Sequence, residues 1–391
     1  MTIHDPIVIV GSARTPMAGL QGDFKDVAAP KLGSAAIAAA LARSGLSADK
    51  VQEVIMGCVL PAGLGQAPAR QASLGAGLPL SAGCTTINKM CGSGMKAAML
   101  AHDLLLAGSA EVMVAGGMES MSNAPYLLPK ARSGYRMGHD RIIDHMFFDG
   151  LEDAYEKGRL MGTYAEDCAQ TYGFTREAQD DWAFTSLTRA QRAIQDGSFA
   201  GEITSVTTKA GEINSDEQPP KAKMDKIRTL KPAFREGGTV TAANSSSISD
   251  GAAALVLMRR STAETLGAKP LAILAGHATF ADKPGLFPTA PIGSIEALLT
   301  KTGWTKEQVD LFEINEAFAV VAMAAMKSLD LPADKVNVHG GACALGHPIG
   351  ASGARIIVTL LAALQKYDLK RGIASLCIGG GEATAIGLER L

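Results

Sequence analysis

The stretch NKMCGSGMKAAML, residues 88–100, sets Cys91 before Gly92, Ser93 and Gly94 and then continues as an alanine-rich segment that predicts a helix. A thiol at the start of a helix faces free backbone N–H groups and the positive end of the helix dipole, so we expect a lowered pKa and a nucleophilic thiolate. The glycines let another molecule approach the backbone closely. Free cysteines are also among the most buried residues of proteins. The stretch alone leaves both readings open, a reactive thiol and a buried structural cysteine.

Apolar runs and predicted helices alternate on both sides of this stretch. Before it, residues 7–11 and 51–60 are typical of strands, and residues 32–44 are typical of a helix that ends at a glycine. After it, residues 111–115 predict a strand closed by two glycines. Strands that alternate with helices indicate an α/β fold with a largely parallel sheet.

The second half of the chain repeats this plan. Its predicted strands lie at residues 271–275, 309–314 and 373–378, and its predicted helices at residues 294–302, 316–329 and 351–366. Each half places a reactive side chain, Cys91 or His347, on a glycine-rich turn before a helix, and then ends in an apolar strand and a Gly-Gly turn. We interpret this repetition as an internal duplication.

The segment between the halves, residues 120–249, is richer in charge, Met, Tyr and Pro. Within it, residues 176–196 predict a helix capped by Thr175. Residues 218–235 are irregular and basic. Such a run is either a solvated face or a lid that contacts the phosphates of a nucleotide-tailed substrate.

Three motifs of the second half supply partners for a nucleophile. GGACALGHPIGASGARI, residues 340–356, contains His347, and CIGGGEATAIG begins at Cys377. NEAFA begins at Asn315, just before a predicted apolar helix. Two cysteines, a histidine and an asparagine in glycine-rich or helix-opening contexts suggest covalent catalysis with a general base. A sequence cannot show that these groups meet in space.

Length and charge limit the class of protein. The chain has 391 residues, too many for one ordinary core, so we expect two or three subdomains. A formal net charge of −2 and an aromatic content of 5 % argue against nucleic acid or an anionic membrane as partner. We find no apolar run of about 18 residues, the length of a transmembrane helix. The first residues lack the basic and apolar regions of a secretory signal.

The six cysteines are scattered and include no CxxC pair. They suggest neither a disulfide framework nor a zinc site, and a reducing cytoplasm is the expected compartment. Three of them are interpreted as small buried residues: Cys58, Cys84 and Cys168. Cys343, four residues before His347, is interpreted as packing. His102, in the predicted helix after Cys91, and His339, in a predicted strand, are interpreted as packing or surface groups. No histidine pair has metal-ligand spacing, so we predict no catalytic metal.

The motifs NKMCGSGMKA, NEAFA, GHPIGASGAR and CIGGG occur in the order and at the spacing of the thiolase family, and the whole chain resembles that family. The resemblance is greatest to the short-chain, type II acetoacetyl-CoA thiolases. It implies two similar βαβ-type halves packed as a five-layer α-β-α-β-α sandwich with an inserted loop domain. The implied N-terminal half is residues 1–119 and 250–268, the loop domain that covers coenzyme A is residues 120–249, and the C-terminal half is residues 269–391.

The resemblance implies acetyl-CoA C-acetyltransferase activity: condensation of two acetyl-CoA to acetoacetyl-CoA and CoA, and the reverse thiolysis. Cys91 would carry the acetyl group, His347 would take its proton, and Cys377 would remove the α-proton of the second acetyl-CoA. His347 and a water positioned by Asn315 would hold the enolate oxygen, and the backbone N–H groups of Cys91 and Gly379 would hold the tetrahedral intermediate. Coenzyme A thioesters are then substrates, and no separate cofactor is implied.

The resemblance also assigns binding residues and an assembly. Ser246 matches a serine that hydrogen-bonds the pantetheine chain, although a turn residue is an alternative. Met161, Phe287 and Phe318 match apolar positions around the acyl end of the pocket, although all three could be core residues. Leu160 and Phe287 depart from the usual pattern there, which bears on the preference for unbranched acetoacetyl-CoA. The implied assembly is a homotetramer, a dimer of dimers.

Alternative functions remain open. The first is a broader 3-ketoacyl-CoA thiolase of fatty-acid degradation, although GHPIGASG and CIGGG favour the short-chain type. The second is a non-catalytic thiolase-like lipid carrier, a class that generally loses the nucleophile or its partners. Condensing enzymes that depend on carrier proteins share the fold but use one cysteine with two histidines or with His and Asn, so they do not need Cys377.

Overall fold

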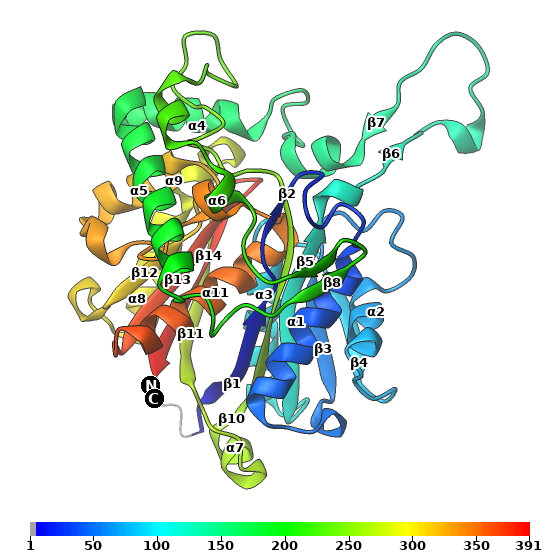
Figure 1. The fold of residues 1–391 in the computed structure, drawn as a ribbon, viewed down its shortest axis with the longest axis vertical. Coiled ribbons are helices and arrows are strands. Elements are labelled where there is room, and N and C mark those ends of the chain that lie inside the picture. Colours follow the sequence, from blue (N-terminus) through cyan, green and yellow to red (C-terminus); the bar gives the residue numbers. More distant parts are fainter. Residues whose placement is uncertain (1–4) are drawn as a thin grey trace.

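The computed structural model describes residues 5–391, so the first four residues of the predicted N-terminal half lie outside the described part (Figure 1). One mixed sheet runs through the molecule in the order β12-β13-β14-β11-β1-β10-β5-β3-β4, with β2 paired to β10. Its strands are β1 (Ile7–Arg14), β2 (Ala18–Gly19), β3 (Glu53–Gly57), β4 (Gly83–Ile87), β5 (Val112–Ser120), β10 (Ser249–Arg259), β11 (Ala272–Ala281), β12 (Leu311–Ile314), β13 (Arg371–Ile378) and β14 (Glu382–Arg390). Two short hairpins lie outside it: β6 (Tyr126–Leu127) with β7 (Ile143–Asp144), and β8 (Val206–Thr208) with β9 (Gly211–Ile213).

Helices cover the outer faces of this sheet, and two of them lie between the strands of its two halves. They are α1 (Ala29–Ser44), α2 (Pro68–Gly75), α3 (Ser93–Ala107), α4 (Met161–Tyr172), α5 (Arg176–Gln195), α6 (Gln218–Lys221), α7 (Arg260–Leu266), α8 (Ala290–Thr302), α9 (Ala319–Leu329), α10 (Ala342–Leu345) and α11 (Ile349–Lys366). Of these, α11 is apolar and long enough to cross a membrane, but 83 % of it is buried inside the protein, so it is the core helix of this fold.

The strands are buried on both faces, which explains their nearly continuous apolar sequences. In β1, Ile7 and Ile9 face one core, and Val8 and Val10 face another. Because side chains alternate along a strand, every second residue of β10 divides in the same way between the two cores.

The prediction of a largely parallel sheet is wrong. Among the described strands, only β3–β4, β3–β5 and β12–β13 pair in parallel, and the other pairs of the sheet are antiparallel. The reason is visible at the C-terminus, where Gly379, Gly380 and Gly381 alone separate β13 from β14. A connection this short permits only an antiparallel return, since a parallel one needs a crossover of a dozen residues or more.

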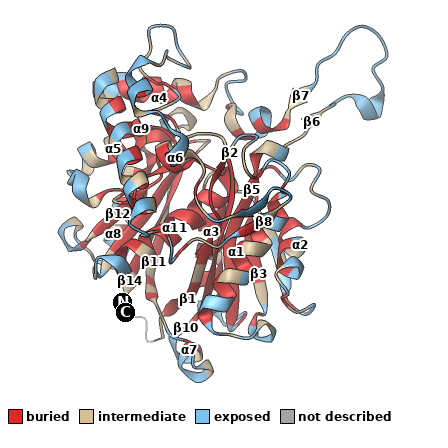
Figure 2. Cartoon of the chain, viewed as in Figure 1, coloured by how far each residue is buried: buried red, intermediate tan, exposed pale blue. Residues whose placement is uncertain are grey.

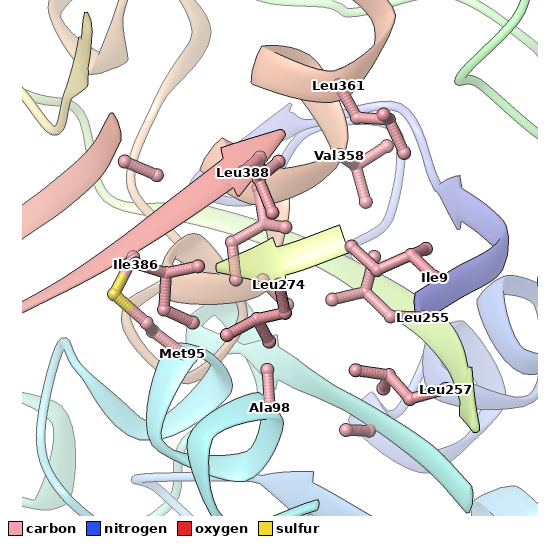
Figure 3. Close-up of a cluster of buried hydrophobic side chains, with 14 of the residues drawn as sticks. Ile9, Met95, Ala98, Leu255, Leu257, Leu274, Val358, Leu361, Ile386 and Leu388 are labelled. Atoms are coloured by element: carbon pink, nitrogen blue, oxygen red, sulfur yellow. The ribbon is translucent and has the colours of Figure 1, made fainter. Parts of the chain in front are cut away.

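Five layers are present, as the thiolase resemblance implies. A central core encloses α3 and α11 between the strands of the two halves, including Met95, Ala98 and Val358 (Figure 3). A second core packs α1 and α2 on the outer face of the N-terminal strands, and a third packs α8 and α9 on the outer face of the C-terminal strands. Figure 2 shows the consequence: buried residues fill the sheet and central helices, and exposed residues mark the outer helices.

The two central helices touch through glycines. A Cβ atom on Gly353 of α11 would lie 2.4 Å from the backbone nitrogen of Met95, and one on Gly94 of α3 would lie 2.8 Å from that of Ala354. Real Cβ atoms do not approach this closely, so both positions need glycine. This contact brings together the N-termini of α3 and α11, which follow Cys91 and His347 in the chain.

We expect Gly353→Ala to destabilise the protein by about 1–3 kcal/mol, because an extra methyl group in a close-packed core forces the two helices apart. Urea denaturation measures this loss. Gly201→Ala is a matched control, since nothing lies within 4 Å of a Cβ built on Gly201. Equal stability of Gly353→Ala and the wild type would show that the helices tolerate separation.

Residues 121–248 connect two strands that pair with each other, since Ser120 of β5 lies opposite Asp250 of β10. The predicted helix at residues 176–196 is confirmed as α5, and the Thr175 hydroxyl accepts a hydrogen bond from the Ala178 N–H at 3.2 Å. Helices α4 and α5 contact α9 of the C-terminal half, and the β6–β7 hairpin extends away from the body as a long arm (Figure 1). The exact boundaries of the three segments stay a prediction.

Candidate active site

Three of the four groups that the sequence could not place together share one cavity of about 350 Å³. They are Cys91, His347 and Cys377, and Gly379 also lines this cavity. Cys91 precedes α3, His347 precedes α11, and the other two residues lie at and just beyond the end of β13. The remaining lining residues are mostly apolar: Phe147, Gly150, Leu151, Leu160, Met161, Gly162, Ala233, Phe234, Ala242, Ser245, Ser246, Ser247, Ile248, Phe287, Ala317, Phe318 and Ile349.

The turn that presents Cys91 is strained and held by hydrogen bonds. Met90 has φ +46°, which is unusual for a residue other than glycine. The Ser93 hydroxyl donates to the Met90 carbonyl at 2.6 Å and accepts the Lys89 N–H at 2.8 Å. The Asn88 side chain accepts the Met90 N–H at 2.9 Å. These contacts fix the thiol at the cavity wall.

The expectation of a lowered Cys91 pKa is wrong. Burial raises the pKa of the Cys91 thiol to about 11, and the backbone N–H groups of Gly379 and of Cys91 itself oppose this rise only in part. Desolvation of the thiolate therefore outweighs the helix terminus. The two opposing groups are the N–H donors that the thiolase resemblance implies for the tetrahedral intermediate, and both face the sulfur.

His347 is buried with one nitrogen anchored and one free. Its Nδ1 lies 2.6 Å from the Ser352 hydroxyl, and its backbone N–H donates to the Ser247 carbonyl at 3.1 Å. Its Nε2 is buried and has no hydrogen-bond partner among the described residues. Gly346 makes the sharp turn before it, with φ +99° and space for no Cβ, which would lie 2.1 Å from the Ser249 hydroxyl. Burial, aided by the charge of Arg355, lowers the His347 pKa to about 3, so the ring is neutral at pH 7.

Asn315 lies behind His347, and it is not among the residues that line the cavity. Its Nδ2 is 3.5 Å from His347 Nδ1. Arg355 donates to the Asn315 side-chain oxygen at 3.4 Å and to Glu313 at 2.9 Å, and all of these groups are buried. Arg355 therefore orients the amide. Ser352 and Arg355 were missed at the sequence level, although both belong to the GASGAR motif after His347.

Cys377 is 1 % exposed and ends in the cavity. Burial raises its pKa well above the usual value, and the neighbouring sulfur of Cys91 is the next cause. The resting state therefore holds two protonated thiols beside each other and a neutral imidazole.

Aromatic side chains form the apolar end of the cavity. The Phe287 ring lies 6.2 Å from the Tyr164 ring and 6.4 Å from the Phe318 ring, and the Phe234 ring lies 5.9 Å from that of Phe318. Met161 also lines the cavity and packs against the cluster that contains Phe287 and Phe318. The structure thus places the three acyl-end residues that the resemblance implies, Met161, Phe287 and Phe318, together. Phe147, Leu151 and Phe234 were missed, because an aromatic or aliphatic residue carries no local signal for lining a pocket.

A second cavity of about 430 Å³ adjoins the first. Both are lined by Ala242 and Ser247, so they share a wall. Lys221, Lys223 and Lys226 line the second cavity, and they come from the basic run noted in the sequence. Ser246 lines the first cavity, and its hydroxyl donates to the Ala317 carbonyl at 3.0 Å. Ser247 was missed by sequence reasoning.

Comparison with known families identifies the chain. The thiolase N-terminal domain matches residues 7–261, and the thiolase C-terminal domain matches residues 268–390. The chain belongs to the thiolase family. Acetyl-CoA acetyltransferase 2 of Arabidopsis thaliana is 51 % identical to this thiolase over 392 residues, which cover 98 % of this chain and 97 % of that one. An acetyl-CoA acetyltransferase of Pseudomonas aeruginosa is 47 % identical over 98 % of this chain and 99 % of its own length.

Solved structures agree with this thiolase over its whole length. The Acat5 thiolase from Ascaris suum, crystallised in complex with coenzyme A, gives a TM-score of 0.94 at 40 % identity and covers 99 % of this chain and 100 % of that one. The acetyl-CoA acetyltransferase of Bacillus anthracis gives a TM-score of 0.95 at 40 % identity, with 99 % of each chain covered. The five-layer fold is therefore that of a thiolase.

Proposed function

We propose that this thiolase is an acetyl-CoA C-acetyltransferase that condenses two acetyl-CoA to acetoacetyl-CoA and CoA and catalyses the reverse thiolysis. The single observation that carries this proposal is the meeting of Cys91, His347 and Cys377 in one cavity. Full-length relatives named acetyl-CoA acetyltransferase support it. The three groups also speak against a non-catalytic lipid carrier, since a carrier has no use for two thiols and an unpaired imidazole nitrogen.

In the first half-reaction Cys91 attacks the acetyl carbonyl and passes its proton to Nε2 of His347, the ring nitrogen that has no protein partner. Burial disfavours a charge on Cys91 or on His347 alone. The proton transfer places the new imidazolium beside the reacting centre, where the negative charge develops. The N–H groups of Cys91 and Gly379 stabilise the oxyanion. The tetrahedral intermediate collapses, the C–S bond to CoA breaks, and Cys377, protonated at rest, gives its proton to the leaving sulfur.

The second half-reaction uses the thiolate that Cys377 has just become. It removes the α-proton of the second acetyl-CoA, and the enolate oxygen is held by His347 and by a water that Asn315 positions. The enolate carbon attacks the acetyl group on Cys91, and the C–S bond to Cys91 breaks. The Cys91 thiolate then recovers its proton from His347, so every group returns to its starting state.

Two adjoining cavities suit a substrate with a small acyl group and a long nucleotide tail. The first holds the acyl end, the pantetheine chain passes Ser246 and Ser247, and the second cavity receives the nucleotide. Coenzyme A thioesters act here as substrates, and the proposal needs no separate cofactor and no catalytic metal.

Among the cavity lysines, Lys223 is the best phosphate contact. Lys221 pairs with Glu217 at 2.7 Å and Lys226 with Asp225 at 3.9 Å, whereas Lys223 has no ion pair among the described residues. We expect Lys223→Ala to raise the KM for acetyl-CoA about fivefold with little change in kcat, because one near-surface charge contributes about 1 kcal/mol to binding. Steady-state kinetics at two salt concentrations measures it. Lys209→Ala, an exposed lysine outside the cavity, serves as control; an equal effect of both substitutions contradicts a local contact.

A broader 3-ketoacyl-CoA thiolase remains the second candidate, and Phe287 separates the two. This ring is 3 % exposed and closes the acyl end against Tyr164 and Phe318. We expect Phe287→Ala to raise the ratio of kcat/KM for 3-ketohexanoyl-CoA to that for acetoacetyl-CoA by about tenfold, because two extra methylenes gain about 1.6 kcal/mol of burial. Thiolysis rates over a chain-length series, up to 3-ketohexadecanoyl-CoA and including a 2-methyl-branched substrate, test the proposal. A wild type that prefers the long substrates would make this a degradative thiolase.

We further propose that the enzyme is a cytoplasmic homotetramer, a dimer of dimers. Exposed apolar residues on the β6–β7 arm support assembly: Leu128, Tyr135, Met137 and Ile142. All six cysteines are free thiols, which suits a reducing compartment. Light scattering coupled to gel filtration measures the mass of the assembly in solution, and a monomer would contradict the proposed tetramer.

A further inference from the structure

Two histidines and an aspartate meet outside the active-site cavity, where α3 passes β11. His102 and Asp103 are neighbours on α3, and His277 lies on β11. Asp103 Oδ1 lies 3.0 Å from His102 Nδ1 and 2.9 Å from His277 Nε2. One potential ligand atom from each residue lies within 4.8 Å of the other two. None of the three lines either cavity of the active site.

These separations are close to the distances between the ligand atoms around a bound zinc ion. In a tetrahedral site with metal–ligand bonds of about 2.0–2.1 Å, ligand atoms are about 3.3 Å apart. The two distances to Asp103 Oδ1 are within about 0.4 Å of that value. Small rotations of the two rings would bring the third pair of atoms into range, since the ring centroids of His102 and His277 are 5.0 Å apart.

Burial fixes the two ligand rings. His102 is 5 % exposed and His277 is 8 % exposed, so packing holds both ring nitrogens that face Asp103 in place. The cluster is also accessible, because the Asp103 side chain is 55 % exposed and leaves one side open to solvent and to a water ligand.

The charges around the cluster come from few groups. Asp103 supplies one negative charge, and Lys301, from the end of α8, donates its Nζ to the His277 carbonyl at 3.1 Å. The positive charge of Lys301 repels a cation and limits the affinity of the cluster for it. Replacing Lys301 should therefore raise this affinity, whereas replacing a ligand should lower it.

We propose that His102, Asp103 and His277 bind one Zn²⁺ ion, with water in the open position. Two imidazole nitrogens and a carboxylate oxygen are ligands that zinc accepts and that hard ions such as Mg²⁺ do not favour. The ion links α3, the helix that follows Cys91, to a strand of the C-terminal half. The bound ion stabilises the fold because an unfolded chain does not bring these residues together.

The test is zinc titration of the full-length, EDTA-treated protein by calorimetry, with melting temperature as a second readout. A Cys91→Ser background removes zinc uptake by the active-site thiol. We expect one zinc per chain and a rise in Tm with added zinc. Asp103→Asn and His277→Gln should each weaken binding by about tenfold or more and remove the rise. Lys301→Met should strengthen binding, and His139→Gln, an exposed histidine on the β6–β7 arm, should change nothing.

Zinc binding that Asp103→Asn and His277→Gln leave unchanged would overturn the proposal, and so would the absence of a zinc-dependent rise in Tm. Asp103→Asn keeps the shape of an exposed side chain, so it decides the question even where a change at His277 prevents folding. Cobalt substitution gives a further readout, because a spectrum without thiolate charge-transfer bands excludes the cysteines as ligands.

Discussion

Cys91→Ala is expected to abolish both condensation and thiolysis, with kcat falling by about 10⁴-fold or more, because the acetyl group loses its covalent carrier. The substitution removes one sulfur from a strained turn that is otherwise held by backbone and side-chain contacts of Asn88 and Ser93. The fold should therefore remain. Mass spectrometry after a short acetyl-CoA pulse should find the acetyl group on Cys91 of the wild type and nowhere on the variant.

Cys84→Ala is the matched control for Cys91→Ala. It also removes a partly buried thiol, but Cys84 lies on the edge strand β4 and does not line the cavity. We expect wild-type rates for it. Acetylation of a residue other than Cys91, or wild-type turnover by Cys91→Ala, would end the covalent mechanism.

The sequence predicted most elements of the fold because helix and strand periods are local signals. The predicted strand at residues 7–11 is part of β1, and the predicted helix at residues 351–366 is confirmed as α11. What failed was pairing direction. Strands β10 and β14 are long, apolar and antiparallel to their neighbours, and the periodicity of a buried strand does not reveal which way its neighbour runs.

The predicted helix at residues 316–329 shows how distant contacts override local preference. Helix α9 begins only at Ala319, and Phe318 is extended. The cause is Glu316, which is fully buried and accepts hydrogen bonds from Trp182 at 3.0 Å and from Ser186 at 2.7 Å. Both partners lie on α5, far away in the sequence, so no local pattern could have shortened the helix.

The candidate site shows the same contrast between local signals, which a sequence reveals, and distant contacts, which it does not. Cys91, His347 and Cys377 were visible because each sits in a glycine-rich motif, and the structure brings them into one cavity. Groups that orient these residues, such as Arg355, were invisible because their role depends on contacts that folding creates. The pKa of Cys91 was misjudged for the same reason: the local helix terminus can be seen in a sequence, but the desolvation that outweighs it cannot.

Cys377→Ala is expected to separate the two half-reactions. Acetyl-Cys91 should still form, more slowly, because His347 can still accept the Cys91 proton. Condensation should fall on the order of 10³-fold, since a positioned general base contributes about 10²–10⁴-fold. Exchange of the α-protons of acetyl-CoA with solvent deuterium, followed by mass spectrometry, measures the missing step directly.

Cys168→Ala provides the comparison for Cys377→Ala, because Cys168 is another buried thiol of the same core but lies outside the cavity. It should exchange α-protons at the wild-type rate. If Cys377→Ala also exchanged them normally, another group would be the base, and His347 would be the first to examine. A variant that neither exchanges nor becomes acetylated would instead show that the second thiol is needed to protonate the departing CoA. Cys377 gives up its proton in the first half-reaction and takes one in the second, so its loss can block either step.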